Sequence, residues 1–240
     1  MEIPMPVEVS VILPTINERS CLEVVGPRLE AALEGLECEF IVVDDESSDG
    51  TPEWCEERAA SNPSWKVLRR VNAKGLASAV IDGFAVARGK YFVVMDADGS
   101  HPPEQVSRLV CPIADGRAEF VLASRGGIFG TGNGLSLGRK IVSVAGSLLA
   151  RPLTPVTDPM SGFFAIHPRI LRRAVLSPLG FKIGLEVIVK CHPSPIVEVE
   201  YTFGSRIAGK SKLSSHQVFE FLRHLSRLYG HQTSAPWDTR

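Results

Sequence analysis

Short apolar runs alternate with segments of helical spacing along the first half of the chain. The runs, each bounded by polar residues, are Val9–Leu13, Phe40–Val43, Val67–Leu68, Tyr91–Met95 and Phe120–Ala123. Between them, residues 22–36 and 77–87 repeat apolar or small side chains three and four positions apart, which predicts helices. Continuous apolar strands that alternate with helices are typical of a mostly parallel sheet covered on both faces. The pattern therefore predicts an α/β fold whose first half is a nucleotide-binding unit.

The chain shows one fold unit and one extended glycine-rich segment. A length of 240 residues with 44% hydrophobic content is enough to bury a core, and no internal repeat or low-complexity tract divides it. Gly126–Gly138 holds glycines at 126, 127, 130, 132, 134 and 138. Such a segment in a compact domain is typical of an active-site lid, with a disordered surface connection as the alternative.

Charge and cysteine content exclude several classes of protein. A formal net charge of −1 argues against nucleic acid as a partner, so an anionic ligand must be met by locally placed Arg and Lys. The five cysteines are scattered without a C-x-x-C pair, which predicts neither a zinc site nor a disulfide framework and favours a reducing compartment. No apolar stretch reaches the roughly 18 residues that span a bilayer, and we expect neither a membrane span nor a secretion signal.

Carboxylates follow the first two predicted strands. The first strand runs into residues 14–18, which end in Glu18, and the second runs into the acidic stretch 44–49. Because acidic groups repel phosphates, these side chains suit the hydrogen-bond donors of a nucleobase and ribose. We favour a base contact for Asp45, whereas Asp49 or Thr51 fits the start of a helix.

The fourth apolar run ends in two carboxylates separated by one residue. Asp96, Ala97 and Asp98 follow the run directly, and Ser100 and His101 precede a proline-marked helix start. Oxygen ligands of this kind suit Mg²⁺ or Mn²⁺, which bind partly through substrate phosphates. The alternative is a capped turn with solvated carboxylates. For His101 we favour packing beside the helix start over metal binding.

Further motifs in the second half make a family resemblance explicit. In order, they are Ala123-Ser124-Arg125 with the glycine-rich segment, Arg139 with Ser143, Asp158-Pro159-Met160-Ser161-Gly162-Phe163-Phe164, residues 180–186 (GFKIGLE) and residues 203–213 (FGSRIAGKSKL). With the Asp-Ala-Asp segment they resemble family 2 glycosyltransferases of the GT-A fold, over Val9–Leu213. Within that family the chain resembles the dolichol-phosphate (polyprenol-phosphate) mannose synthases.

The resemblance implies a single GT-A (Rossmann-like) α/β domain with a mixed, mostly parallel sheet, and a role for each matching residue. It assigns a Mg²⁺ or Mn²⁺ ion to Asp96, Asp98 and Ser100, although some relatives have Gln in place of Ser100. Ile16 likewise stands where the family often has Tyr. Donor nucleotide contacts are assigned to Pro14, Glu18, Asp45, Asp96, Ala97, Asp98, Arg206 and Lys212. Of these, Asp98, Arg206 and Lys212 are the expected catalytic groups, and Arg125, Arg139 and Ser143 are expected to bind the acceptor phosphate.

The implied reaction is an inverting transfer of a hexose, mannose from GDP-mannose, to a dolichyl or polyprenyl monophosphate. The second pKa of such a phosphate is about 6, by analogy with phosphorylated side chains, so the acceptor is already a nucleophile at neutral pH. The site then needs cations that position the phosphate and needs no general base. The roles of Asp158 and Glu186 stay open. Each either orients an Arg or Lys of the site or accepts hydrogen bonds within a buried turn or helix.

The last predicted element is an amphipathic helix. We divide the chain into a catalytic domain, 1–213, and a C-terminal helix and tail, 214–240. One stripe of this helix carries Val218, Phe221, Leu222, Leu225, Leu228 and Tyr229. The stripe fits either a membrane interface or packing on the sheet. The resemblance leaves two arrangements open, because some relatives continue here into transmembrane helices and others depend on small membrane-anchoring subunits. We expect a peripheral protein on the cytosolic face of the endoplasmic reticulum or plasma membrane.

Three other functions compete with this interpretation. A family 2 transferase with another donor, such as UDP-glucose, or with a saccharide acceptor would need a catalytic carboxylate, for which Glu186 or Asp158 is the best candidate. A nucleotidyltransferase would carry a glycine-rich phosphate loop after its first strand, which residues 14–18 do not resemble. A catalytically silent sugar-nucleotide sensor would not need Asp96, Asp98, Arg206 and Lys212.

Overall fold

One mixed sheet organises the protein. The computed structural model describes residues 7–72, 74–126, 137–177, 179–207 and 215–234, with the backbone alone for 137–143, 215–217 and 232–234. In this part of the chain the sheet has seven strands in the order β3-β2-β1-β4-β6-β5-β7, and β6 is antiparallel to its two neighbours. The strands are β1 (Val9–Thr15), β2 (Cys38–Asp44), β3 (Trp65–Arg69), β4 (Tyr91–Val94), β5 (Phe120–Ser124), β6 (Phe164–Ile166) and β7 (Ile196–Glu200).

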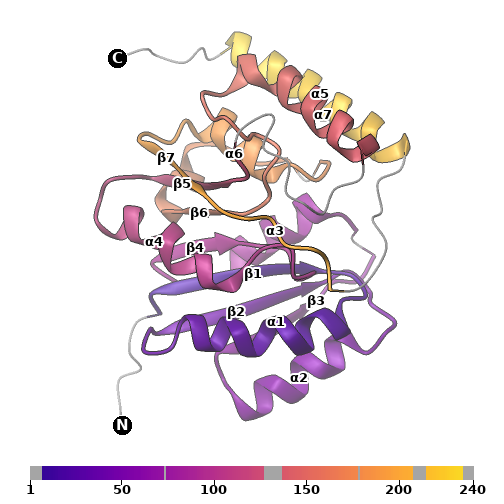
Figure 1. The fold of residues 1–240 in the computed structure, drawn as a ribbon, viewed down its shortest axis with the longest axis vertical. Helices are drawn as coiled ribbons and strands as arrows, with labels where there is room; N and C mark the ends of the chain where they lie inside the picture. The colour runs from indigo at the N-terminus through magenta and orange to yellow at the C-terminus, as the bar shows by residue number, and fades with distance from the viewer. Residues whose placement is uncertain (1–6, 73, 127–136, 178, 208–214, 235–240) are drawn as a thin grey trace.

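The helices lie on both faces of the sheet, as the sequence pattern predicts (Figure 1). They are α1 (Arg19–Ala32), α2 (Thr51–Ser61), α3 (Leu76–Val86), α4 (Val106–Ala114), α5 (Leu137–Ala150), α6 (Ile183–Cys191) and α7 (Ser215–Ser234), with short 3₁₀ turns η1 (Pro103–Gln105), η2 (Arg151–Leu153) and η3 (Pro168–Arg173). All five predicted strands and the predicted early helices are confirmed. Apolar periodicity did not predict β6, β7 or α6.

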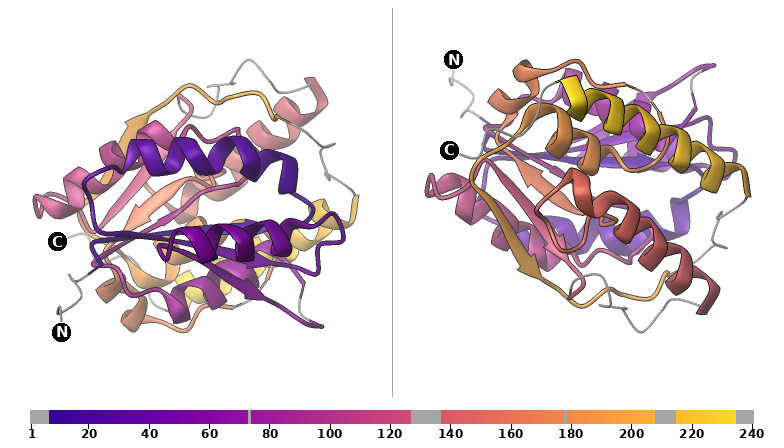
Figure 2. Two further views of the ribbon diagram at one scale, coloured as in Figure 1. Left: turned by 90° about the horizontal axis from the view of Figure 1, so that it is seen from below. Right: turned by 90° about the horizontal axis from the view of Figure 1, so that it is seen from above.

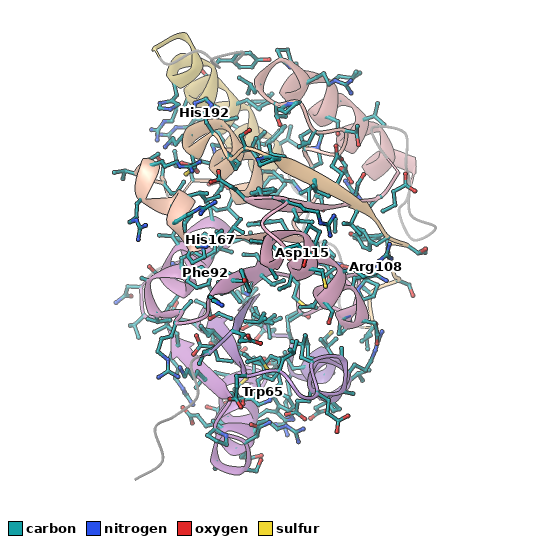
Figure 3. All side chains as sticks on the ribbon, turned by 90° about the vertical axis from the view of Figure 1, so that its left-hand side faces the viewer. Trp65, Phe92, Arg108, Asp115, His167 and His192 are labelled. Carbon is teal, nitrogen blue, oxygen red and sulfur yellow. The ribbon has the colours of Figure 1, made fainter. Side chains whose placement is uncertain are left out.

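Alternation along the strands divides the core between the two faces. Val11 and Leu13 of β1 pack with α1, α2 and α4, whereas Ile12 packs on the opposite face with α3 and α6. Trp65 of β3 is buried in the core that α1, α2 and α4 cover (Figure 3). Its ring and that of Trp54 are nearly perpendicular, with 5.6 Å between ring centroids. Strands β4, β5 and β6, which are covered on both faces, are apolar at nearly every position.

A third layer of helices covers α6. Figures 1 and 2 show α5 and α7 side by side, on the far side of α6 from the sheet. Leu185 and Val189 of α6 are buried there against Phe221, Leu225 and Leu228 of α7. These three α7 residues therefore pack against the protein, as one alternative predicted, but on α6 and not on the sheet. Phe219 and Leu222 of α7 stay exposed, at 66% and 47%. Among the described residues, no helix is long and apolar enough to cross a membrane.

Candidate active site

A cleft of about 440 Å³ opens at the carboxyl edge of the parallel strands. This is the edge at which ligands of open α/β sheets bind. Nine of the predicted site residues line it: Pro14, Glu18, Asp45, Asp96, Ala97, Asp98, Ser100, Arg125 and Arg206. Because the neighbouring strands are β2, β1, β4, β6 and β5, their ends bring residues 14 to 125 to one place. The fold therefore gathers the predicted residues, while their individual roles stay predictions.

Asp45, at the β2 end of the cleft, is held in one orientation. Its carboxylate accepts hydrogen bonds from the Arg70 guanidinium and, at 2.8 Å, from the Gly75 amide. Arg70 is itself buried, donates to the Ser78 hydroxyl at 2.6 Å and forms an ion pair with Asp82 at 2.9 Å. A carboxylate fixed in this way presents its remaining lone pairs to the cleft in a constant direction.

Asp98 stands at the centre of the turn after β4. Its Oδ1 accepts from the Ser100 amide at 2.9 Å and the Ser100 hydroxyl at 2.6 Å, and its Oδ2 lies 2.7 Å from Nε of Arg206. The segment that carries Arg206 lies directly on this turn, since the Gly204 amide donates to the Ser100 carbonyl at 2.9 Å. A Cβ at Gly204 would lie 2.9 Å from the Gly99 carbonyl oxygen, so only glycine permits this approach.

The buried side chain of His101 supports the turn after β4 from the side of the core. Its Nδ1 accepts a hydrogen bond from the Asp96 amide at 2.8 Å, and its ring stacks on Phe163 with 4.8 Å between centroids. Burial lowers the pKa of His101 below its ordinary value, against the opposing charges of Asp96 and Asp98. The expectation that His101 packs beside the helix start agrees with this geometry. The Asp96 carboxylate, 35% exposed, is the more open of the two.

The donor set at the turn fits a divalent cation that takes part of its ligands from a substrate. The two carboxylates and the Ser100 hydroxyl are hard oxygen ligands, and they lie at the cleft. Nowhere in the described ranges do three or more His, Cys, Asp or Glu side chains form a cluster that could hold a metal. Mg²⁺ is commonly bound by one or two carboxylates together with substrate phosphates and water, which is the set available here.

Arg125 follows β5 and is fixed by a buried carboxylate. Its Nε and Nη2 donate to the two oxygens of Asp158 at 2.8 and 2.7 Å, and its guanidinium carbon lies 5.7 Å from the centre of the Phe203 ring. Burial alone would lower the pKa of Arg125, but the hydrogen bonds and charge of Asp158 raise it above its ordinary value. Arg125 therefore keeps its positive charge at the cleft.

Glu186, the second unassigned carboxylate, lies away from the cleft. It is fully buried in α6, with Lys190 at 2.7 Å, His224 of α7 at 3.3 Å and the Ser177 amide at 2.6 Å. Burial alone would raise the pKa of Glu186, but the neighbouring His224, Lys190 and Ser177 amide lower it. Neither Glu186 nor Asp158 is among the described residues that line the cleft.

The side chains of three predicted residues lie outside the part of the chain that the structure describes. Arg139 and Ser143 lie in α5, of which the structure gives only the backbone at these positions, and Lys212 lies outside the described residues. Most of the predicted lid, residues 127–136, lies outside them as well.

Sequence reasoning missed Arg70 and left Lys182 without a role. Lys182 lines the cleft and donates to the Met160 carbonyl. Arg70 follows β3 directly, so the rule of searching immediately after each apolar run would have found it after Val67–Leu68. Lys182 follows no strand, and only the tertiary contact between residues 160 and 182 reveals its position.

An open α/β sheet with paired carboxylates after β4 and an arginine against them is the arrangement of the GT-A fold class. A family model described as "Glycosyl transferase family 2" matches residues 10–179. The chain belongs to glycosyltransferase family 2. It is 44% identical over 225 residues to the dolichol-phosphate mannosyltransferase of Pyrococcus furiosus, covering 92% of this chain and 63% of that one. It is 37% identical over 241 residues to the enzyme of the same name from Saccharomyces cerevisiae, covering 94% and 88%.

A solved structure supports the fold assignment. Glucosyl-3-phosphoglycerate synthase from Mycobacterium tuberculosis, in complex with Mn²⁺, UDP-glucose and phosphoglyceric acid, superposes with a TM-score of 0.69 at 27% identity, over 93% of this chain and 80% of that one. The GT-A fold and the family resemblance inferred from the motifs are thus confirmed. The chain spans less than two thirds of the length of the Pyrococcus furiosus relative.

Proposed function

We propose that this protein transfers a hexose, mannose from GDP-mannose, to a dolichyl or polyprenyl monophosphate with inversion at the anomeric carbon. The relatives named above are dolichol-phosphate mannosyltransferases, and they match over more than nine tenths of this chain. A phosphate oxygen of the acceptor attacks the anomeric carbon as the bond to the nucleoside diphosphate breaks.

The observation that carries this proposal is that Arg125 keeps its charge at the cleft, while the two carboxylates considered as bases lie outside its described lining. A saccharide hydroxyl would need a carboxylate to remove its proton. Asp158 and Glu186, the candidates for that role, are both buried in ion pairs outside the cleft lining. A lipid phosphate dianion instead needs cations that overcome repulsion from the donor and align it. Arg125 meets that need, together with Arg139 and Ser143 as proposed further contacts.

On the donor side, Asp45, Glu18 and Pro14 are proposed to contact the nucleoside. Asp96 and Asp98, with Ser100, would hold Mg²⁺ or Mn²⁺, and Ala97 lies between them. When bound, the ion would neutralise negative charge on the diphosphate. Arg206 already lies against Asp98, and with Lys212 it is proposed to stabilise the leaving nucleoside diphosphate.

We also propose that the protein acts at a membrane surface, on the cytosolic face. Exposed apolar side chains occur on both outer helices, Leu148 and Leu149 on α5 and Phe219 and Leu222 on α7. The two helices are joined where the Tyr229 hydroxyl donates to the Leu149 carbonyl at 2.6 Å. Apolar side chains exposed in this way suit the boundary between lipid headgroups and acyl chains. Small membrane-anchoring subunits are proposed as further partners.

A different donor or acceptor is the second candidate. The structural relative is named for a soluble phosphate-bearing product and is bound to UDP-glucose. A small phosphate-bearing acceptor such as 3-phosphoglycerate would need the same cations as a lipid phosphate. The test must therefore include one.

The test is a transfer assay with labelled GDP-mannose, UDP-glucose and UDP-GlcNAc, each offered a detergent-solubilised polyprenyl phosphate or 3-phosphoglycerate, with Mg²⁺, Mn²⁺ or chelator. We expect label in the organic phase from GDP-mannose, dependent on metal. Asp98→Ala should abolish it, and Asp115→Ala, an exposed aspartate beyond the end of α4, should not. Label on 3-phosphoglycerate alone would reject the lipid acceptor, and metal-dependent nucleotide binding without any transfer would favour a sensor.

A further inference from the structure

Asp158 is buried directly behind Arg125. Its carboxylate accepts three hydrogen bonds from this one residue, from Nε at 2.8 Å, from Nη2 at 2.7 Å and from the backbone amide at 3.1 Å. The side chain of Asp158 is 2% exposed and that of Arg125 is 11% exposed. Asp158 precedes β6, whereas Arg125 follows β5, so the pair joins two segments 33 positions apart.

The contacts fix the plane and rotation of the guanidinium. A two-point pairing between a guanidinium and a carboxylate has one favoured geometry. The ring of Phe203 lies beside the group, 5.7 Å from the guanidinium carbon to the ring centre. Nη1 is the one guanidinium nitrogen for which the described residues supply no hydrogen-bond partner, and Arg125 lines the cleft.

We propose that Asp158 is a positioning residue for the acceptor phosphate, which it serves by holding Arg125 with the Nη1 hydrogens available for that phosphate. This inference rests on the proposed function. Asp158 does not touch the acceptor itself, because both of its oxygens are occupied by Arg125 and it does not belong to the described lining of the cleft. It therefore acts on substrate affinity and alignment, and not as a base.

The first test separates acceptor from donor kinetics. In Asp158→Asn and Asp158→Glu we expect the KM for polyprenyl phosphate to rise roughly 10- to 100-fold, since small displacements of a positioning group have effects of this size. The KM for GDP-mannose should change less than about 2-fold. Asp158→Glu keeps the negative charge and so protects folding. Glu119→Gln is the matched control: Glu119 is also buried and paired with arginines, Arg169 and Arg173, but lies outside the cleft lining.

The second test asks whether Asp158 acts through Arg125. In an Arg125→Gln background, Asp158→Asn should raise the acceptor KM less than about 2-fold further. An equal rise in both backgrounds, or a rise in donor KM that matches the rise in acceptor KM, would overturn the proposal. A base would behave differently, since Asp158→Asn would then lower kcat and remove a limb of the pH–rate profile.

A binding experiment keeps this inference independent of turnover. Farnesyl phosphate is titrated into the protein with GDP and Mg²⁺ while the ¹⁵N signal of the Arg125 side chain is followed. We expect a saturable shift in the wild type that is lost in Asp158→Asn. A wild type that shows this shift but transfers no sugar would reject the proposed reaction and leave the positioning role standing. An unresponsive Arg125 signal would reject the positioning role.

Discussion

At the scale of single residues, buried arginines connect the cleft to its surroundings. Arg70 forms an ion pair with Asp45, and the side chain of Arg70 is only 4% exposed. Removing one partner of a buried ion pair leaves an uncompensated charge, which costs far more than the loss of an exposed pair. The adjacent Arg69 binds Glu53 and Glu56 at the surface and offers a direct comparison.

We predict that Arg70→Ala lowers the free energy of unfolding by about 3–5 kcal/mol. It should also weaken donor nucleotide binding at least about tenfold, because Asp45 loses its fixed orientation. Arg69→Ala should cost less than about 1 kcal/mol and leave nucleotide binding unchanged. Chemical denaturation and calorimetric titration with GDP measure both quantities. Equal effects of the two substitutions would contradict the assigned role of Arg70.

At the scale of elements, the outer helix α7 divides its apolar residues between the protein and the surface. Leu225 is 4% exposed and packs toward α6, whereas Leu222 is 47% exposed one turn earlier. The stripe in the sequence contains both residues. Only the docking of α7 on α6 separates a core position from a position available to a lipid surface.

We predict that Leu225→Ala lowers the free energy of unfolding by about 2–5 kcal/mol, the usual cost of a cavity in a packed core. Leu222→Ala should cost less than about 1 kcal/mol, since a surface change removes few contacts. Vesicle binding should instead depend on Leu222. In flotation with anionic lipid vesicles, Leu222→Asp should reduce binding while the fold is retained. Unchanged flotation of Leu222→Asp would contradict the proposed membrane face.

Glu119 joins three elements at the amino-terminal side of β5. It accepts hydrogen bonds from Arg169 and Arg173 of η3 and from the Ser194 amide that precedes β7. Burial alone would raise the pKa of Glu119, but the hydrogen bonds and charges of these groups lower it below its ordinary value.

A carboxylate whose pKa is lowered by folding stabilises the native state above its unfolded-state pKa, and this stabilisation is lost as the pH falls through the folded-state pKa. We therefore predict that Glu119→Gln lowers stability at pH 7. It should also lose less stability than the wild type when the pH is taken below about 4.5, near the ordinary pKa of Glu. Urea unfolding at a series of pH values tests this, and parallel curves for the two proteins would contradict it.

At the scale of the whole molecule, the cleft combines groups from β1, β2, β4, β5 and the segment after β7. A ligand that binds it therefore stabilises the folded state alone. With donor nucleotide at 100 times its dissociation constant, this stabilisation is about 2.7 kcal/mol.

We predict a rise in the melting temperature of the protein when GDP-mannose and Mg²⁺ or Mn²⁺ are added together. The shift should largely disappear with chelator and in Asp96→Ala, because the carboxylates and the diphosphate would share one ion. Differential scanning fluorimetry measures this without turnover. The same shift in the presence of chelator would show that donor binding does not depend on a metal.

The sequence by itself determined the fold class and nine of the residues that line the cleft. Apolar runs mark strands that are buried on both faces, and side chains that directly follow such runs must meet at one edge of a parallel sheet. Asp45, Asp96 and Asp98 were found in this way, and the motifs of the second half, together with the Asp-Ala-Asp segment, led to the family. The apolar runs and the residues that follow them are local along the chain, so periodicity and spacing are enough to predict them.

Tertiary structure alone decided which carboxylates reach the cleft and which are buried as partners. Asp158 and Glu186 are equivalent in the sequence as acidic residues within family motifs. One is bound to Arg125, 33 positions away, and the other is bound to His224 across two helices. The insertion of antiparallel β6 between β4 and β5 and the docking of α7 on α6 were decided in the same way. Such contacts depend on which side chains become neighbours on folding, and no spacing along the chain specifies them.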